Sequence, residues 1–185
     1  MISLILLAGG TGSRMGAVHP KQFLLLGGQP VALHSFNLFM EIPEIGEIIV
    51  VCDPAYQNIF HSSSKPLFFA PPGKRRQDSV YNGLQQCSPH AELIVVHDSA
   101  RPFLEKKDLL NLLEAASRVG AATLATPITS TIKQGNAEKR VEKTVDRSQL
   151  WEIQTPQAIR ADWIREGFQR VHQKNLQVTD DVSIV

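Results

Sequence analysis

The sequence predicts an α/β fold: a Rossmann-like, mostly parallel twisted sheet with helices on both faces, plus a protruding β-arm. Three observations lead to this prediction. Short apolar runs of strand length alternate along the chain with segments of helical period. The chain has 185 residues, 43% of them hydrophobic, which suits one domain with a substantial core. One polar, β-branched stretch breaks the alternation.

The spacing of the apolar residues along the sequence predicts where each strand and each helix lies. Strands buried on both faces are continuous apolar runs, whereas helices repeat apolar residues every three to four positions. Pro30 suits the first turn of a helix. We expect strands at 3–7, 47–52, 67–69, 93–97 and 123–126, and helices at 30–40, 78–86, 106–118 and 162–173.

The stretch that breaks the alternation runs from about 129 to 149. Two β-branched segments flank the turn cluster Gln134-Gly135-Asn136, which is typical of a hairpin. The hairpin has too little apolar surface to cover its own face, and such arms commonly pack on something else. We therefore expect an arm that packs on a second copy of the chain, in a homodimer.

Composition excludes several classes of protein. The formal net charge is +1, which argues against a nucleic-acid partner. Cys52 and Cys87 lack the spacing of a zinc site and are expected to be buried thiols. No run reaches the length of a membrane span, and the apolar run Ile2–Leu7 is too short for a signal peptide. The sequence predicts a cytoplasmic protein that binds no membrane.

Residues 8–22 place a glycine-rich turn and two cations directly after the first apolar run. Backbone N–H groups at Gly9, Gly10 and Gly12 can close on phosphate oxygens, while Arg14 and Lys21 supply positive charge. This pattern indicates a nucleotide triphosphate site. The alternative is an ordinary glycine turn after an edge strand.

Two better-known phosphate loops do not match. A dinucleotide fingerprint needs a third glycine where this chain has Met15. A Walker loop needs Ser or Thr after the lysine, but Gly73-Lys74 is followed by Arg75.

A second polar cluster, His97-Asp98-Ser99-Ala100-Arg101-Pro102, follows the strand expected at 93–97. Ligands of parallel α/β sheets bind beyond the carboxyl ends of the strands. A single carboxylate there suits Mg²⁺, which keeps several waters and binds substrate phosphates. The alternative is that Asp98 caps a turn or pairs structurally with Arg101.

Several motifs then occur in order along nearly the whole chain. They are Leu7-Ala8-Gly9-Gly10-Thr11-Gly12-Ser13-Arg14-Met15, Pro20-Lys21-Gln22, Arg76-Gln77-Asp78-Ser79-Val80, His97-Asp98-Ser99-Ala100-Arg101-Pro102, Thr144-Val145-Asp146-Arg147, Leu150-Trp151, Gln154-Thr155-Pro156-Gln157 and Thr179-Asp180-Asp181. Each motif is weak alone, but the ordered set is specific. The chain resembles the 2-C-methyl-D-erythritol 4-phosphate cytidylyltransferases of the non-mevalonate isoprenoid pathway.

The resemblance implies a single nucleotidyltransferase domain over residues 1–185, with a nucleotide-diphospho-sugar transferase-like fold and a dimerisation arm. It implies transfer of CMP from CTP to methylerythritol phosphate, with release of pyrophosphate and with Mg²⁺ held by Asp98. The implied catalytic residues are Arg14, Lys21 and Arg147. The implied CTP-binding residues are Ala8, Gly9, Gly10, Gly12, Arg14, Lys21, Gly73, Arg76 and Ser79. The implied acceptor-binding residues are Arg101, Thr131, Arg147 and Thr179.

Two features depart from the family pattern. Pro71-Pro72 stand before Gly73, where the family usually has two glycines. The chain stops at Val185, whereas the family continues through a helix, a further strand and a segment with a phosphate-binding lysine. We therefore expect a truncated C-terminal element, a mobile stretch near 176–185, and poor turnover of methylerythritol phosphate.

Alternative functions and roles remain open at this point. The chain can be a ribitol-5-phosphate cytidylyltransferase, a sugar-1-phosphate nucleotidyltransferase using another base, or a catalytically silent nucleotide-binding regulatory domain. Ser79 and Thr179 can instead cap helices. Arg147 can instead form a surface ion pair with Asp146.

Overall fold

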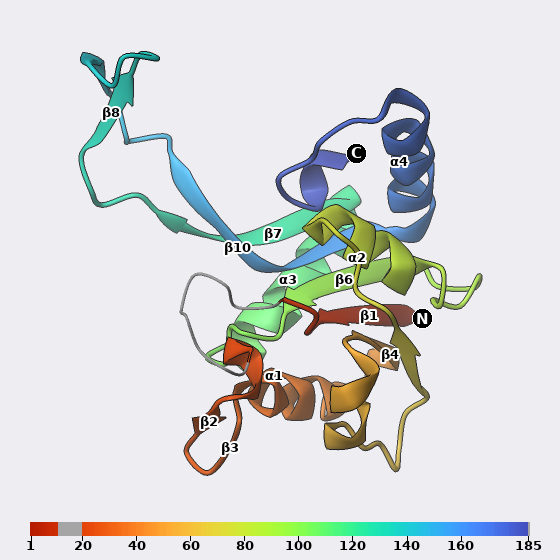
Figure 1. The fold of residues 1–185 in the computed structure, drawn as a ribbon. Helices are drawn as coiled ribbons and strands as arrows, with labels where there is room; N and C mark the ends of the chain where they lie inside the picture. Colours follow the sequence, from red (N-terminus) through yellow and green to blue (C-terminus); the bar gives the residue numbers. More distant parts are fainter. Residues whose placement is uncertain (11–19, 185) are drawn as a thin grey trace.

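The computed structural model describes residues 1–10 and 20–184. A six-stranded sheet with the order β5-β4-β1-β6-β10-β7 forms its centre (Figure 1). The strands are β1 (Ile2–Leu7), β4 (Ile45–Val51), β5 (Leu67–Ala70), β6 (Leu93–Asp98), β7 (Ala121–Pro127) and β10 (Trp151–Arg160). Strands β5, β4, β1 and β6 are mutually parallel, and β10 runs antiparallel to β6 and β7. The predicted, mostly parallel sheet is confirmed.

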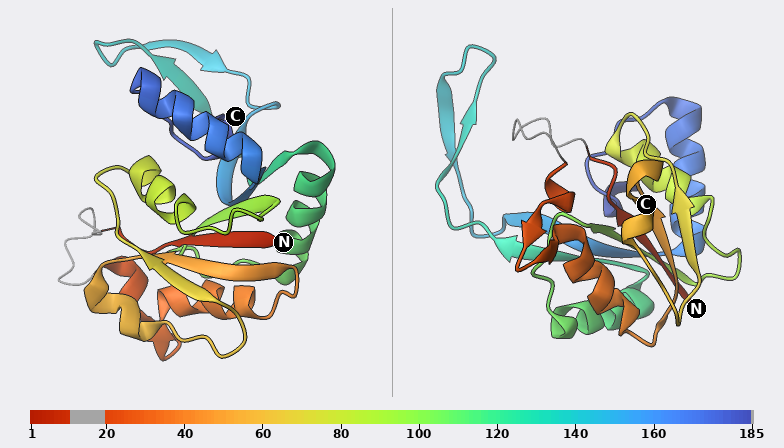
Figure 2. Two further views of the ribbon diagram at one scale, coloured as in Figure 1. Left: turned by 90° about the vertical axis from the view of Figure 1, so that its right-hand side faces the viewer. Right: turned by 60° about the horizontal axis from the view of Figure 1, so that its bottom comes forward.

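Four helices cover the two faces of the sheet (Figure 2). On one face lie α1 (Val31–Met40) and α3 (Lys106–Val119), and on the other lie α2 (Arg76–Leu84) and α4 (Ala161–Lys174). Every predicted helix is confirmed to within two residues at each end. Successive strand residues point to opposite faces, so each strand contributes to both cores.

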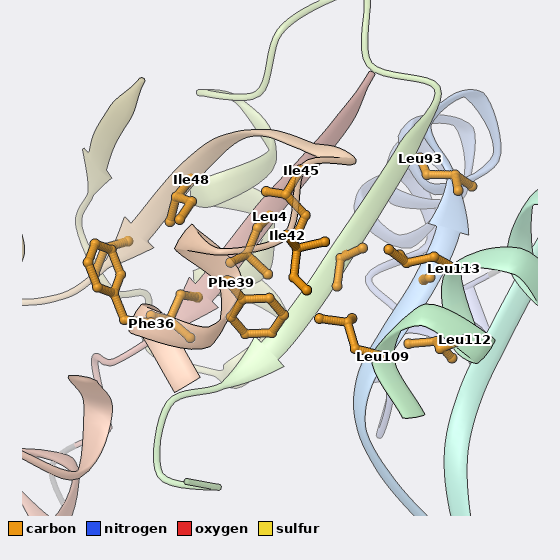
Figure 3. Close-up of a cluster of buried hydrophobic side chains, with 14 of the residues drawn as sticks. Leu4, Phe36, Phe39, Ile42, Ile45, Ile48, Leu93, Leu109, Leu112 and Leu113 are labelled. Atoms are coloured by element: carbon orange, nitrogen blue, oxygen red, sulfur yellow. The ribbon is translucent and has the colours of Figure 1, made fainter. Parts of the chain in front are cut away.

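The core under α1 and α3 is fully apolar at its centre. Figure 3 shows Leu4 and Ile48 from the sheet meeting Phe39 and Leu109 from the two helices. Each of these four side chains is completely buried. This packing fixes the strands, and therefore fixes the loops at their carboxyl ends, where the candidate site lies.

The sequence analysis missed strand β10. Pro156 lacks the N–H of a ladder donor, and the glutamines on either side of the Thr155–Pro156 pair read as loop. The register of β10 against β7 shifts between Ile153 and Gln157, which accommodates the interruption. Smaller elements were also not expected: β2 (Leu25–Leu26), β3 (Gln29–Pro30), η2 (Lys21–Phe23), η3 (Pro54–Ile59) and η4 (Val182–Ile184).

The predicted hairpin is present as a separate two-stranded sheet of β8 (Ile132–Gly135) and β9 (Val141–Val145). We call residues 129–149 the arm. It stands away from the body of the molecule (Figure 1). Nearly all its residues are exposed, and Val141 is 65% exposed. The partner that would cover the arm stays a prediction.

The segment after α4 packs back onto the body. Asp181 is 1% exposed, and Ile184 lies so close to Gly167 that a Cβ there would be 2.4 Å from Ile184 Cγ2. The helix expected to begin at Thr179 is replaced by the short η4, which begins at Val182, so Thr179 does not cap it. The described part of this segment is therefore anchored.

The remaining expectations concern cysteines and membrane spans. Cys52 and Cys87 are buried free thiols, as predicted. Burial raises the pKa of Cys52 to about 11 and that of Cys87 to about 12, so both are protonated at neutral pH. Among the described residues, no helix has the length and apolar character needed to cross a membrane.

Candidate functional site

The candidate site lies where the order of the sheet reverses. Strand β1 continues through α1 to β4 on one side, while β6 lies on the other side of β1 and continues through α3. Ligands of open α/β sheets bind at such a point, beyond the carboxyl ends of the strands. Leu7 at the end of β1 pairs with Asp98 at the end of β6. The two loops identified in the sequence therefore leave the sheet as neighbours.

The entrance of the glycine loop is held by a buried glutamine that the sequence analysis did not assign a role. Gln22 is 3% exposed, and its Nε2 donates to the carbonyls of Ala8 and Gly10, each at 2.7 Å. The Ala8 N–H donates to the Val51 carbonyl at 2.8 Å. Gln22 follows the exposed Lys21 in η2, so the loop entrance and that cation are fixed together. Gly12 and Arg14 lie outside the described residues.

Two glycines are required by close approach of neighbouring loops. A Cβ on Gly9 would lie 2.3 Å from Cβ of Pro72, and one on Gly73 would lie 2.4 Å from Cβ of Asp78. The loop after β5 therefore packs directly on the loop after β1, with Pro72 filling the space over Gly9. An added Cβ on Gly10 meets no described atom within 4 Å.

The start of α2 orders the next predicted residues. The Gly73 N–H donates to Ser79 Oγ at 2.9 Å. The residue that caps the helix is not Ser79, because Asp78 Oδ2 accepts from the N–H of Arg75 at the N-cap position, at 3.1 Å. The capping alternative for Ser79 is therefore wrong. A side-chain hydrogen bond from Arg75 lowers the pKa of Asp78.

Arg76 links two carboxylates at the end of β6. Its Nη1 and Nη2 donate to the two oxygens of Asp181, each at 2.8 Å. Its Nε and Nη2 also lie 3.2 and 3.1 Å from Oδ1 of Asp98. Arg101 Nε lies 3.6 Å from Oδ2 of Asp98, so the structural pairing considered from the sequence is present. The Arg76 contacts were not expected. We call Arg76, Asp98, Arg101 and Asp181 the ion-pair cluster.

Burial and charge act in opposite directions within this cluster. Burial disfavours the charged guanidinium of Arg76, but the hydrogen bonds and charges of Asp181 and Asp98 outweigh it and raise the Arg76 pKa. Burial raises the pKa of Asp181, although Arg76 opposes the rise. Two 2.8 Å hydrogen bonds join the pair, so the ionised form is the stable one.

A buried relay fixes the backbone around Asp98. The Arg101 carbonyl can only accept, so His97 Nε2 donates to it at 3.1 Å. The other ring nitrogen then accepts from Thr155 Oγ1 at 3.1 Å, and the Thr155 oxygen accepts from the Asp98 N–H at 3.1 Å. Burial lowers the pKa of His97 to about 4, so the ring is neutral at neutral pH. Strand β10, which the sequence did not predict, supplies Thr155.

The donor set fits a magnesium ion bound with a nucleotide. Asp98 is a hard carboxylate whose side chain is 30% exposed. Among residues 1–10 and 20–184, no group of three or more His, Cys, Asp or Glu side chains forms a complete metal site. One carboxylate with waters and phosphate oxygens is an ordinary magnesium environment.

The predicted acceptor-binding residues are not all brought together within one chain. Thr179 lies beside Val178, whose N–H donates to Gln77 Oε1 in α2 at 3.0 Å. Thr131 and Arg147 are on the arm, and Arg147 Nη1 donates to the Thr129 carbonyl there. Among the described residues, no hydrogen bond or ion pair joins the arm to the ion-pair cluster.

The surface ion pair considered for Arg147 is not formed either. Asp146 instead accepts from the Ser148 N–H at 2.9 Å. The ring of Trp163 lies against Gly120 and under the Arg160 guanidinium, whose carbon is 5.1 Å from the ring centroid.

Comparison with known proteins identifies the family. A model of the family described as 2-C-methyl-D-erythritol 4-phosphate cytidylyltransferase matches residues 2–185. This chain belongs to that family. The chloroplastic enzyme of that name from Oryza sativa is 51% identical over all of this chain, which spans 63% of that protein. The enzyme of that name from Chlamydia pneumoniae is 47% identical over 97% of this chain and 82% of its own length.

A solved structure supports the same assignment. The 4-diphosphocytidyl-2C-methyl-D-erythritol synthase of Anaerococcus prevotii superposes with a TM-score of 0.88 at 26% identity, covering 100% of this chain and 82% of its own. The predicted family, the fold class and the cytidylyltransferase class of enzyme are confirmed. The roles of individual residues stay predictions.

Proposed function

We propose that this chain transfers the cytidylyl group of CTP to 2-C-methyl-D-erythritol 4-phosphate, in isoprenoid precursor biosynthesis. The observation that carries the proposal is the family match from residue 2 to residue 185, with relatives of that name at 51% and 47% identity. An oxygen of the acceptor phosphate attacks the α-phosphorus of CTP and forms a new P–O bond. The bond from the α-phosphorus to the bridging oxygen breaks, and pyrophosphate leaves with its electron pair.

We assign the residues of the two loops to CTP. The N–H groups of Gly9, Gly10 and Gly12 would bind phosphate oxygens, and Lys21 with Arg14 would stabilise the charge that develops at the α-phosphorus. Support for Lys21 comes from its attachment to the loop entrance through Gln22.

Cytosine would lie over the start of α2, against Ala8, Gly73 and Ser79, with Arg76 beneath the phosphates. The Ala8 carbonyl accepts one hydrogen bond from Gln22 and has a second lone pair for the cytosine amino group. Ser79 Oγ accepts from the Gly73 N–H at 2.9 Å and donates only a long hydrogen bond, 3.4 Å, to the Arg75 carbonyl, so a bound base could take over its proton.

Asp98 would hold the Mg²⁺ of the nucleotide. The bound ion would neutralise phosphate charge and polarise the α-phosphate. The chain's own contribution is to fix the carboxylate, through Arg76 and Arg101 on its oxygens and through Thr155 on its backbone N–H.

We infer that the acceptor is bound by Arg101 and Thr179 of one chain and by Thr131 and Arg147 of another. The exposed arm, which has no ion pair or hydrogen bond to the cluster among the described residues, favours a homodimer in which the arms are exchanged. The cytoplasmic location expected from the sequence stays a prediction.

The test is a pyrophosphate-release assay with each of the four nucleoside triphosphates and with methylerythritol phosphate or ribitol 5-phosphate as acceptor. We expect release only with CTP, Mg²⁺ and methylerythritol phosphate. Equal release with ribitol 5-phosphate, or with another base, would change the assigned substrate. Calorimetric CTP binding with no release from any acceptor would replace the enzyme by a nucleotide-binding regulatory domain.

A further inference from the structure

Asp181 is a buried carboxylate that the proposed chemistry does not use. It is 1% exposed, and its only ionic partner among the described residues is Arg76. Its segment is clamped by two glutamines: Gln157 Oε1 accepts from the Asp181 and Val182 N–H groups at 2.8 and 2.9 Å, and Gln77 bonds the backbone of Leu176 and Val178. The carboxylate therefore cannot move without breaking several buried hydrogen bonds.

Arg76 is held in turn by Asp181 and is thereby directed at Asp98. The guanidinium is planar, so two 2.8 Å bonds to Asp181 fix the direction of its remaining N–H groups. Those groups lie 3.1 and 3.2 Å from Oδ1 of Asp98, and Arg101 lies 3.6 Å from Oδ2. Both oxygens of the assigned metal ligand thus already face a cation.

The net charge of the ion-pair cluster determines whether a divalent cation can bind Asp98 without a nucleotide. The ion-pair cluster contains two guanidinium groups and two carboxylates, so its charges cancel. A free divalent cation at Asp98 would sit beside two fixed positive charges and would have to displace one of them. The same cation carried by a triphosphate brings an excess of negative charge, which offsets that repulsion.

We propose that Asp181 is a positioning residue that holds Arg76 against Asp98 as an internal counter-cation, so that a divalent cation binds Asp98 only together with the nucleotide. This inference depends on the proposed function, because it takes Asp98 as the metal ligand of a cytidylyltransferase.

The experiment is a titration with Mn²⁺, followed by its electron paramagnetic resonance signal, with and without CTP and without any acceptor. The wild-type chain is expected to bind Mn²⁺ only when CTP is present. Arg76→Gln removes one competing cation, so its affinity for Mn²⁺ without CTP should rise by about tenfold or more. The matched control is Arg75→Gln, whose partner is Asp78, and it should bind no better than the wild type.

Asp181→Asn tests the positioning role itself. It removes the two hydrogen bonds that direct Arg76 at Asp98, so the preference of Mn²⁺ for the CTP-bound chain over the free chain should shrink by about fivefold or more. Asp180→Asn, which changes the neighbouring and less buried carboxylate, should leave that preference unchanged. Circular dichroism checks that each variant is folded. An unchanged preference in a folded Asp181→Asn would show that Asp181 does not position Arg76. If Asp181→Asn does not fold, Asp181→Glu, which keeps the charge but displaces the carboxylate, takes its place in the same comparison.

The outcomes separate this inference from the proposed function. If the wild type binds Mn²⁺ equally well with and without CTP, or if Arg76→Gln gains nothing, the counter-cation role is wrong even though CTP binds. If a gain in Arg76→Gln survives the addition of Asp98→Asn, the metal is not at Asp98 and the inference also fails. If the chain binds no CTP with any divalent cation, the proposed function itself fails.

Discussion

The ion-pair cluster and the arm are opposite kinds of surface. In the cluster, Asp181 is a charged side chain that is 1% exposed, whereas on the arm Val141 is an apolar side chain that is 65% exposed. Charged residues are almost never fully buried unless they are paired, and Asp181 is paired. The apolar surface of the arm has no such partner among the described residues. The cluster is therefore completed by this chain, while only the proposed homodimer would give the arm a second surface.

In the proposed homodimer, this difference divides the reaction between two chains. Asp98 ends β6, Arg76 begins α2 and Lys21 begins η2, and the positions of these elements are fixed by two buried cores and by Gln22. Thr131 and Arg147 lie on the arm, which joins the body where β7 meets β10 and, among the described residues, makes no hydrogen bond or ion pair with the cluster. A substitution in the first group should impair the active site of the chain that carries it. A substitution in the second group should impair the active site of the partner chain.

The largest effect is expected at Lys21. If Lys21 acts on the charge that develops during transfer, Lys21→Ala should lower turnover by roughly 10²-fold or more, while CTP affinity changes less. Steady-state kinetics and calorimetric CTP binding measure the two quantities. Arg118→Ala is the control, because it removes an exposed cation from the last turn of α3, which leads into the start of β7 and away from the carboxyl ends of β1 and β6. Equal losses in binding and turnover would make Lys21 a ground-state phosphate clamp.

The next effect tests whether the arm works in trans. Arg147→Ala and Lys21→Ala should each be nearly inactive alone. After subunit exchange at equal amounts, half of the dimers are mixed and each has one intact site, so about a quarter of wild-type activity should return. Arg140→Ala, which removes an arm cation paired only with Glu138, should be active without a partner. Confirmed exchange without any return of activity would place Arg147 in its own chain's site or outside any site.

The sequence predicted correctly those elements that are defined by residues close together in the chain. The apolar runs and the hairpin turn are each defined by a few consecutive residues, and the structure confirms the elements they predict. Sequence reasoning failed where the partner is distant. Arg76 and Asp181 are 105 residues apart, and Gln77 reaches the Leu176 carbonyl 99 residues away.

The missed residues share a physical property. Gln22, Gln77 and Gln157 are all nearly fully buried, and they satisfy backbone groups of other segments. Glutamine is usually exposed, so its identity alone gives no signal of such a role. The same applies to β10, since Pro156 argues against a strand until the neighbouring strands are in place.

The third effect is a pH dependence of the body. The pKa of His97 is lowered from 6.5 to about 4 when the chain folds. Between these values the unfolded chain binds a proton that the folded chain excludes. Stability should therefore fall as pH decreases from 6.5 toward 4, by at most about 1.4 kcal/mol per pH unit from this group. Urea unfolding at pH 7 and pH 5 measures the effect.

The histidine responsible can be identified by substitution. His97→Gln should lower stability at pH 7, because the relay to Arg101 and Thr155 is lost, and should flatten the decrease toward pH 5. His90→Gln, at an exposed position, should leave the decrease as it is. An unchanged pH slope in His97→Gln would show that other groups govern the acid sensitivity of the body.

The smallest effect is expected at an arm valine. Val80 lies on the buried face of α2, so Val80→Ala should lower the free energy of unfolding by about 1–3 kcal/mol, whereas Val141→Ala should change it by less than about 0.5 kcal/mol in the dilute monomer. The same unfolding experiment at a higher protein concentration tests whether Val141 is buried in a dimer. If arms are exchanged, the free energy of unfolding of the wild type and of Val80→Ala rises with concentration by mass action. That of Val141→Ala rises less, because part of the contact between the two chains is lost. Unfolding measured at two concentrations distinguishes the cases. Equal gains in all three proteins would mean that Val141 stays exposed in the dimer and that another face of the arm makes the contact.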